Sequence, residues 1–560
     1  MSTPLLQIRN LAIQFQQAGT ATTVVDGVDL AIERGETFAL VGESGSGKSV
    51  TALAAMRLLP GAARIVSGQV RLRDEDLLRQ PEWKMNEVRG RRIAMIFQDP
   101  QTSLNPVQTI GRQIQEVLGR HLGLRGRQAR GRCLELLKQV DIPEAERRID
   151  QYPHQLSGGQ RQRVMIAIAL AGEPELLIAD EPTTALDVTI QAQIMALLKD
   201  LQRRHHMALW LISHDLGLVA DIADKAAVMR KGKIVETFDG ADGPLFANPR
   251  HPYTLELLAA LPRLEHCVGK KAEPAPPLLE VRDLKVWYPI RKGVLKRVKG
   301  HVKAVDGASF TLETGRTLAL VGESGCGKTT LGKAILRLIP ATSGKVLWRG
   351  RDIDTLSLKT RCRAMQIVFQ DPFSAMNPRM LVGDILAEGL VSLYPEIPVG
   401  ERRQRVERLL EEVGLPPSSR LRYPHEFSGG QRQRLCIARA LAVEPRLIVC
   451  DEPTSALDVS VQKQIIELLQ RLQRQKHISY LFITHDLAVV AEIADQVAVM
   501  HQGKILELGE TRQVLHTPRH PYTQKLLSAL PGKALESSLT LLRNKSLNSS
   551  GDNAGAHKYP

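Results

Sequence analysis

Short, continuous apolar runs that end at glycine or at carboxylates recur along the chain. Residues 37–41 and 176–180 are such runs, and residues 447–451 repeat the second one. They are too short for helices, and apolar runs of this length bounded by turn signals are typical of strands buried on both faces. Further strands are predicted at 92–97, 208–212, 366–369 and 480–483, and helices at 50–56, 161–171 and 432–442.

The chain contains the same motifs twice, in the same order. The segment VGESGSGKS at residues 41–49 occurs again as VGESGCGKT at 321–329. From this motif to the last shared one, HPYT at 251 and 520, the separation of the two copies drifts only from 280 to 269 residues. A nearly fixed period indicates a repeated structural unit, so we expect two copies of one domain of roughly 260 residues.

Composition around the repeat predicts the domain limits. Residues 270–277, KKAEPAPP, are charged and rich in proline, as in an exposed, semi-rigid linker. Residues 544–555 are polar and rich in glycine, serine and asparagine, and such a segment buries too little apolar surface to fold. We predict a first domain at 1–262, a linker at 263–277, a second domain at 278–531 and a disordered tail at 532–560.

A glycine-rich loop between a predicted strand and a predicted helix indicates a phosphate-binding site in each copy. Glycines in the pattern Gly-x4-Gly-Lys-Ser/Thr let backbone N–H groups turn towards a phosphate at a helix N-terminus. Lys48 is expected to reach the β- and γ-phosphates of a nucleotide and Ser49 to hold Mg²⁺, with Lys328 and Thr329 as their counterparts. The other loop positions are Gly42, Glu43, Ser44, Gly45, Ser46 and Gly47, and Gly322, Glu323, Ser324, Gly325, Cys326 and Gly327.

Carboxylates follow the second buried strand of each copy. Asp180 fits the role of holding Mg²⁺, and Glu181 that of a general base that orients and polarises an attacking water. A single Asp-Glu pair at a strand end is most often a surface turn. Here Asp451 and Glu452 repeat the pair at the same distance before a strand-ending histidine, which favours the catalytic interpretation.

That histidine and a glutamine complete the predicted catalytic set. His214 and His485 each lie 33 residues after the glutamate and follow an apolar run. In doubly wound folds the carboxyl ends of the strands form the ligand crevice, so a histidine there can donate a hydrogen bond to a γ-phosphate. Gln98 and Gln370 also follow short strands and can reach Mg²⁺ or the water, although glutamine chemistry alone is weakly informative.

Each copy also carries a second glycine-rich turn that opens a helix. Such a helix N-terminus is an anion site in addition to the phosphate loop, and it needs a phosphate from elsewhere. The economical source is the nucleotide of the other half, which requires a head-to-tail pair. The residues concerned are Ser157, Gly158, Gly159 and Gln160, and Ser428, Gly429, Gly430 and Gln431.

Charge and cysteine usage narrow the class. The net charge is +15, and residues 120–132 and 291–303 are basic runs without an acid. Aromatic residues make up only 4% and do not alternate with these runs, so solvated faces or attraction to anionic headgroups explain them better than nucleic acid does. No run of 18 apolar residues, secretory signal or Cys-x-x-Cys pair is found, so we expect a cytosolic protein without membrane spans or disulfides.

Together these motifs resemble the nucleotide-binding domains of ABC-type transport ATPases. The phosphate loop, the Q-loop glutamine, the signature (LSGGQ or FSGGQ), the carboxylates, the D-loop and the H-loop histidine occur twice in this order, over about residues 5–531. The resemblance implies an α/β fold of two tandem P-loop NTPase domains, each a RecA-like core with antiparallel β and helical subdomains. It also implies ATP and Mg²⁺ as cofactors, and an aromatic residue that stacks on adenine; Phe15 and Tyr288 stand at the matching positions.

Further segments resemble the ATP-binding subunits of peptide, glutathione and nickel importers, of which fused versions serve glutathione and microcin C uptake. These segments are YPHQ at 152, YPHE at 423 and both HPYT segments. This resemblance implies two integral-membrane permease subunits, an extracytoplasmic solute-binding protein, and a peripheral location at the cytoplasmic face of the bacterial inner membrane. Some relatives carry a four-Cys Fe–S cluster after HPYT, but only Cys267 follows the first copy, so we predict no cluster.

A soluble tandem ATPase that acts on ribosomes or DNA is the alternative class, and the net charge fits it. Translation-factor types carry a long charged helical linker, however, whereas 18 residues separate Pro262 from Val281 here. DNA-repair types insert Cys-rich zinc modules, which this sequence lacks. We favour the importer motor, with peptides, glutathione, opines, nickel chelates and peptide antibiotics all open as solutes.

Overall fold

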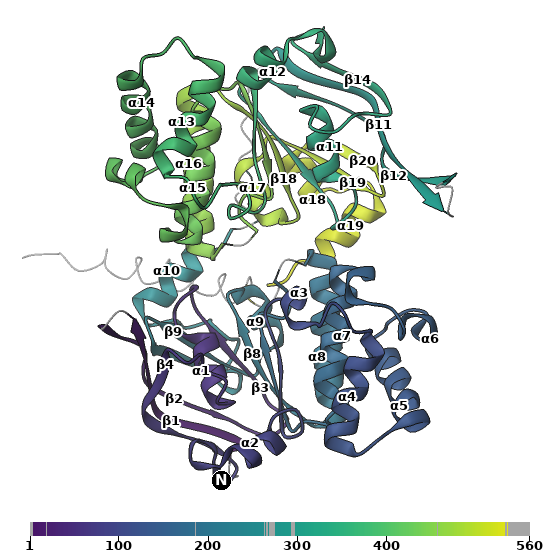
Figure 1. Cartoon of the computed structure of the whole chain (residues 1–560), viewed down its shortest axis with the longest axis vertical. Helices are drawn as coiled ribbons and strands as arrows, with labels where there is room; N and C mark the ends of the chain where they lie inside the picture. Colours follow the sequence, from purple (N-terminus) through teal and green to yellow (C-terminus); the bar gives the residue numbers. More distant parts are fainter. Residues whose placement is uncertain are drawn as a thin grey trace, which may run out of the picture. The chain divides into compact units, whose positions relative to one another are not determined.

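The computed structural model describes residues 4–17, 20–184, 186–262, 264, 267, 275–292, 297–455, 457–532 and 535. The chain divides into two compact units. The first comprises residues 1–186, 190–259 and 530–560, and the second comprises residues 187–189 and 260–529. Each unit has two sheets and its own set of helices (Figure 1). Most of the predicted linker (263–277) and of the predicted tail (532–560) lies outside the described residues.

A six-stranded sheet forms the centre of the first unit. From one edge to the other its strands are β10 (Lys233–Asp239), β9 (Lys225–Arg230), β3 (Thr37–Val41), β8 (Ala208–Ser213), β7 (Leu176–Asp180) and β6 (Ile93–Ile96). The last five run parallel, and β10 is antiparallel to β9. Because the five are parallel, the residues that follow β3, β6, β7 and β8 meet at one edge of the sheet.

An antiparallel sheet and a group of helices complete the first unit. The sheet contains, in order, β2 (Thr20–Ile32), β1 (Leu6–Gln17), β4 (Ala63–Leu72) and β5 (Glu75–Asp76). Figure 1 shows α4, α5 and α7 gathered beside the central sheet, away from β1 and β2. The helices of this unit include α1 (Lys48–Ala55), α2 (Glu82–Val88), α3 (Pro100–Ser103), α4 (Ile110–Leu122), α5 (Gly126–Gln139), α6 (Ala145–Arg148), α7 (Gly158–Leu170), α8 (Val188–His205, whose first two residues group with the second unit), α9 (Leu216–Ile222) and α10 (Pro252–Ala260).

The second unit repeats this architecture. Its central sheet has the order β16 (Met365–Val368), β17 (Leu447–Asp451), β18 (Ser479–Thr484), β13 (Thr317–Val321), β19 (Gln496–His501) and β20 (Lys504–Glu510). Its antiparallel sheet has the order β12 (Arg297–Glu313), β11 (Pro277–Lys292), β14 (Ser343–Trp348) and β15 (Arg351–Asp352). Its helices include α11 (Lys328–Ile335), α12 (Leu358–Ala364), α13 (Val382–Leu393), α14 (Val399–Glu412), α15 (Gly429–Leu441), α16 (Val459–Lys476), α17 (Leu487–Ile493), α18 (Thr511–His516) and α19 (Pro521–Ser528).

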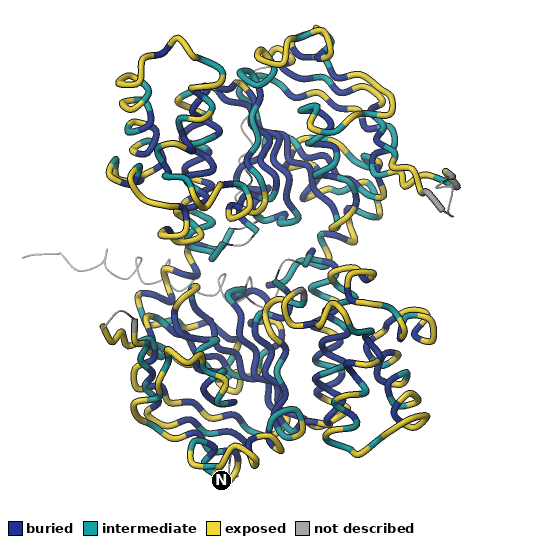
Figure 2. The backbone as a smooth tube through the Cα atoms, viewed as in Figure 1, coloured by how far each residue is buried: buried dark blue, intermediate teal, exposed yellow. Residues whose placement is uncertain are grey.

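The apolar runs become the buried centre of each unit. Every residue of β3, β7 and β8 is buried, as is every residue of β13, β17 and β18 (Figure 2). Side chains on both faces are therefore removed from water, which explains the absence of hydrophobic–polar alternation in these strands. Among the described residues, no helix is both long enough and apolar enough to cross a bilayer.

The observed element bounds differ from the predicted ones mainly at helix starts. β3, β7 and β17 coincide with the predicted strands, and the other predicted strands agree within about two residues. Helix α1 begins at Lys48 rather than at residue 50, and α7 begins at Gly158 rather than at 161. α15 likewise begins at Gly429 rather than at 432. In α7 and α15, the glycines expected to precede the helix belong to its first turn, because Ser157 and Ser428 are the N-caps.

Candidate nucleotide-binding sites

The phosphate loops lie between the central strand and the first helix of each unit. In the first unit β3 ends at Val41 and α1 begins at Lys48. Gly42 has φ 151°, and a Cβ there would lie 2.2 Å from the carbonyl oxygen of Met229 on β9. Gly322 has the same φ, with a Cβ 2.1 Å from the carbonyl oxygen of Met500. Glycine is required at both positions because the loop is pressed against the neighbouring strand.

The lysine of each loop is buried and folded onto the loop itself. The Lys48 ammonium donates hydrogen bonds to the carbonyl oxygens of Gly42 (2.7 Å) and Glu43 (2.8 Å). The Lys328 ammonium does the same to Gly322 (2.6 Å) and Glu323 (2.9 Å). The charge that is expected to meet phosphates is thus held inside the loop by the loop's own backbone.

A hydroxyl and a carboxylate meet beside each lysine. Ser49 donates a hydrogen bond to Asp180 (2.9 Å), and Thr329 donates one to Asp451 (2.8 Å). Burial raises the pKa of Asp180 to about 6, against the opposing effect of the Ser49 hydrogen bond, and burial also raises the pKa of Asp451. Paired oxygen donors of this kind are what Mg²⁺ prefers, so both pairs fit that ion.

The predicted catalytic side chains of the first unit converge on Glu181. Gln98 Nε2 and Thr184 Oγ1 each donate to Glu181 Oε2 at 2.8 Å, and His214 Nδ1 lies 3.3 Å from Oε1. Burial acts to raise the pKa of Glu181, but the hydrogen bond and charge of His214, with help from Thr184 and Lys48, lower it to about 2. The carboxylate is therefore ionised throughout the physiological pH range.

The second unit has the same arrangement around Glu452. Gln370 Nε2 donates to Glu452 Oε2 at 2.8 Å, and His485 Nδ1 lies 3.5 Å from Oε1. The pKa of Glu452 is lowered, because His485 outweighs the effect of burial. The pKa of His485 is raised, because Glu452 likewise outweighs burial. The ion pair therefore keeps the glutamate charged and the histidine pointed at it.

The backbone of both glutamates is unusual. Glu181 has φ 47° and Glu452 has φ 46°, in the left-handed region that side chains other than glycine rarely adopt. The amide of Glu181 donates to the carbonyl of Ile212 on the neighbouring strand β8 at 2.9 Å, and the amide of Glu452 donates to Ile483 on β18 at the same distance. The strands thus fix a strained turn that directs each glutamate towards the histidine.

The signature turns are the capped N-termini of α7 and α15. Ser157 Oγ accepts from the amide of Gln160 (3.4 Å), and the Gln160 side chain accepts from the amide of Ser157 (3.2 Å). Ser428 and Gln431 form the same reciprocal pair. This capping box fixes the first helical turn, whose glycine N–H groups and positive dipole end form the predicted anion site.

The two aromatic residues expected at adenine lie on antiparallel strands. Phe15 is on β1 opposite Thr22 and Ala63, and it is half-buried. Tyr288 is on β11 opposite Val302, and 45% of its surface is exposed. Both therefore belong to the antiparallel sheet of their unit, and their role towards adenine stays a prediction.

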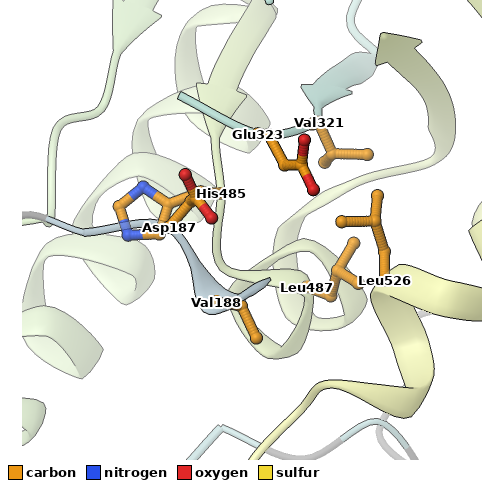
Figure 3. Close-up of a pocket in the computed structure, with 8 residues that line it drawn as sticks. Asp187, Val188, Val321, Glu323, His485, Leu487 and Leu526 are labelled. Carbon is orange, nitrogen blue, oxygen red and sulfur yellow. The ribbon is translucent and has the colours of Figure 1, made fainter. Parts of the chain in front are cut away.

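A small pocket in the second unit opens beside the phosphate loop (Figure 3). Residues 321–323 at the start of the loop line it together with His485, Asp187 and Leu526 of α19. Asp187 belongs to this unit, and its carboxylate accepts a hydrogen bond from the amide of Ser324 at 3.2 Å. The pocket is therefore lined by the phosphate loop, by His485 and by α19.

Comparison with known proteins identifies the class. The ABC transporter family model matches residues 25–184 and 305–455, and the model for the C-terminal region of oligopeptide/dipeptide transporters matches residues 240–281 and 506–554. The chain belongs to the ABC transporter family, as an ATPase with two ATP-binding domains. Its fold is the predicted pair of P-loop NTPase domains, which confirms the fold class.

Several curated relatives match nearly the whole chain. The peptidoglycan transport ATP-binding protein YejF of Agrobacterium fabrum is 52% identical over 94% of this chain and 96% of its own length. An uncharacterised ABC transporter ATP-binding protein YejF of Escherichia coli is 50% identical over 94% and 100%. The glutathione import ATP-binding protein GsiA of Escherichia coli is 49% identical over 94% and 89%. Among solved structures, cbiO1 of Clostridium perfringens is 26% identical over 43% of this chain and 92% of its own, with a TM-score of 0.38.

Sequence reasoning missed two kinds of residue at these sites. Thr184 bonds to Glu181, and its only sequence signal is its place directly after the repeated DEPT motif, where the second copy has Ser455. Tyr253 and Tyr522 bond to the phosphate loops. They lie in the HPYT segments, which indicate the subfamily but predict no contact with the nucleotide site. In both cases the repeat was the available signal, but contacts across the fold were needed to assign a function.

Proposed function

We propose that this chain is the ATP-hydrolysing motor of a bacterial importer for peptides or peptide-like solutes, working through separate permease subunits. The observation that carries the proposal is the presence, in both units, of a complete set consisting of phosphate-loop lysine, hydroxyl–carboxylate pair, glutamate, glutamine and histidine. The oligopeptide transporter region that follows each set supports the importer subfamily.

In each site the side chains divide the work of ATP hydrolysis. Mg²⁺ would be held by Ser49 and Asp180 with Gln98 beside them, and by Thr329, Asp451 and Gln370 in the second unit; when bound, it neutralises charge on the phosphates. Glu181 and Glu452 are ionised and orient the attacking water. His214 and His485 hold these glutamates in place and can donate to the γ-phosphate.

We further propose that each ATP site is composite. The set around Lys48 acts with Ser428, Gly429, Gly430 and Gln431, and the set around Lys328 acts with Ser157, Gly158, Gly159 and Gln160. The number of candidate anion sites in each unit supports this proposal. Each unit has a phosphate loop with its own lysine and also a capped helix N-terminus that needs a second phosphate contact. One chain supplies both members of the pair that such sites require.

The solute is proposed to contain a peptide. Two relatives carry the words peptidoglycan transport and glutathione import in their names, and glutathione and the stems of peptidoglycan share peptide chemistry. We propose that a solute-binding protein outside the membrane selects the solute and that two permeases carry it. The chain would then attach to the cytoplasmic face of the inner membrane through residues 99–107 and 371–379, which follow Gln98 and Gln370.

Reconstitution tests the proposed function. The chain should co-purify with two permease subunits, and in proteoliposomes its ATP hydrolysis should increase when a peptide-loaded binding protein is added. A Lys48→Ala/Lys328→Ala double variant is the matched control, and it should assemble without hydrolysing ATP. Hydrolysis that responds to ribosomes or DNA but not to permeases and loaded binding protein would overturn the importer in favour of a soluble tandem ATPase.

A further inference from the structure

The HPYT segment that closes each domain contacts the phosphate loop of its own unit. In the first unit the Tyr253 hydroxyl accepts a hydrogen bond from the backbone N–H of Glu43, 3.2 Å away. In the second, the Tyr522 hydroxyl accepts one from the backbone N–H of Glu323, 3.3 Å away. The same contact is thus made twice, between residues about 200 positions apart in sequence.

The rest of the segment fixes the tyrosine in place. The Glu236 side chain on β10 accepts hydrogen bonds from the amides of Arg250 and His251, and His251 Nδ1 accepts from the amide of Tyr253 (3.2 Å). The Arg230 guanidinium lies over the Tyr253 ring, 4.4 Å from its centre. The start of α10 is therefore anchored to the edge strand, and the tyrosine has 1% of its surface exposed.

The second unit has an equivalent anchor with a different partner on the ring. The Glu507 side chain on β20 accepts from the amides of Arg519 (2.8 Å) and His520 (3.1 Å). The His501 ring takes the place of the arginine and lies 4.1 Å from the ring of Tyr522. In Figure 3, Leu526 of the same helix lines the pocket together with Val321 and Glu323 from the start of the loop.

The tyrosine and the lysine hold one peptide group from opposite sides. The peptide between Gly42 and Glu43 carries the carbonyl oxygen that accepts from Lys48 and the N–H that donates to Tyr253. In a trans peptide these two groups point in opposite directions. When the lysine turns to a phosphate, the carbonyl loses that hydrogen bond, and the tyrosine continues to hold the N–H.

We propose that Tyr253 and Tyr522 are positioning residues that keep the first peptide of each phosphate loop in its nucleotide-binding orientation. The inference rests on the proposed nucleotide sites and assigns to the HPYT segments a part in them. Gly42 and Gly322 adopt a φ that only glycine tolerates easily, and without a Cβ they leave the start of this peptide less restrained than another residue would. The hydroxyl of an anchored tyrosine, which accepts from the N–H of this peptide, supplies the restraint.

The test compares tyrosine-to-phenylalanine variants of the full chain. Tyr253→Phe/Tyr522→Phe removes the two hydroxyls that accept from the amides of Glu43 and Glu323, which should weaken the binding of Mg-ATP by roughly three- to ten-fold per site. The turnover rate at saturating ATP should change less than the KM, because the hydroxyls do not touch the glutamates or histidines. Each single variant should weaken one of the two sites, which provides the measurement if the double variant does not fold.

Tyr480→Phe is the matched control. The Tyr480 hydroxyl is also buried and donates to the carbonyl of Leu469 at 3.0 Å, within the core of the second unit. Its loss should lower the melting temperature and leave ATP affinity unchanged. ATP affinity of the tyrosine variants within two-fold of wild type, or an equal loss in Tyr480→Phe, would overturn the inference. A wild-type chain that fails to bind ATP would instead refute the proposed function itself.

Discussion

The pKa values of two adjacent carboxylates at the end of β7 are shifted in opposite directions by their surroundings. Burial raises the pKa of Asp180 to about 6, whereas His214 overcomes burial and lowers the pKa of Glu181 to about 2. Neighbouring acids with separated pKa values take separate roles. These pKa values support the proposed roles, in which Asp180 holds the metal ion and its charge is costly without a cation, and Glu181 is the charged group that orients water.

Asp180→Asn should therefore stabilise the protein without nucleotide or metal. The folded chain retains a proton on Asp180 up to about pH 6, while the unfolded chain releases it near pH 3.9, so the free energy of unfolding falls as the pH rises between these values. At pH 7 the substitution should recover up to about 3 kcal/mol. Thermal denaturation in a chelator checks this, and the response to added Mg²⁺ should be lost.

The pH dependence provides a control for the same prediction. The stabilisation of Asp180→Asn over wild type should shrink as the pH falls from 7 to 4, because wild-type Asp180 becomes protonated over this range. Asp451→Asn should behave in the same direction, since burial also raises the pKa of Asp451. A melting temperature below that of wild type at pH 7 would contradict the assignment of a destabilising buried charge.

The capped start of α7 is a structural cap, and we propose that it is also an anion site. Ser157→Ala removes the hydroxyl that accepts from the amide of Gln160, and it should cost about 1 kcal/mol of stability. Ser157→Asp restores the cap, because aspartate is as good an N-cap as serine, but it places a negative charge where a phosphate is expected. We predict near-normal melting and at least about ten-fold weaker ATP hydrolysis for Ser157→Asp.

Comparison of the two variants separates these functions. Circular dichroism melting and steady-state hydrolysis on the same preparations are sufficient. If Ser157→Asp hydrolyses ATP at the wild-type rate, the turn is only a helix cap, and the proposed composite site loses its first-unit signature.

The sequence predicted the elements at the site more accurately than their mutual contacts. β3 and β7 were predicted to the residue, because a strand buried on both faces produces an uninterrupted apolar run. Helix α7 begins three residues before its predicted start, because Ser157 caps the helix and the glycines that suggest a turn form its first turn. The bond between Tyr253 and Glu43 was not predictable, since nothing local to either residue encodes a contact 210 positions away.

At the scale of the whole molecule, the end of the chain contributes to the first unit. The amide of Gly532 donates to the Asp221 carboxylate of α9 at 2.7 Å, and the Leu535 side chain is 4% exposed. Both residues group with the first unit. The tail predicted from composition to begin at 532 therefore starts with packed residues.

Truncation at two points tests the importance of these contacts. A chain that ends at Leu535 should melt and hydrolyse ATP like wild type, because the residues beyond it are polar and rich in glycine and serine. A chain that ends at Pro531 loses the Leu535 side chain and the bond to Asp221, and it should be less stable by about 2 kcal/mol. Equal melting temperatures for the two truncated chains would show that these contacts contribute little.

The two site sets differ only conservatively. Ser46 and Ser49 of the first loop correspond to Cys326 and Thr329 of the second, and the lysine, carboxylates, glutamine and histidine are the same in both. The contacts around Glu181 and Glu452 are also alike, with the glutamine bond at 2.8 Å in each. We therefore predict that both sites hydrolyse ATP, rather than one active site and one degenerate site.

Steady-state hydrolysis by Glu181→Gln and Glu452→Gln, with bound nucleotide quantified in each, distinguishes two active sites from one. Loss of a general base costs about 10²–10⁴-fold in the chemical step. If turnover requires ATP hydrolysis at both sites, each single substitution should impair turnover severely and to a similar extent, and each should trap ATP. If one substitution abolishes hydrolysis while the other leaves it near the wild-type rate, the two sites are not equivalent and the account is contradicted.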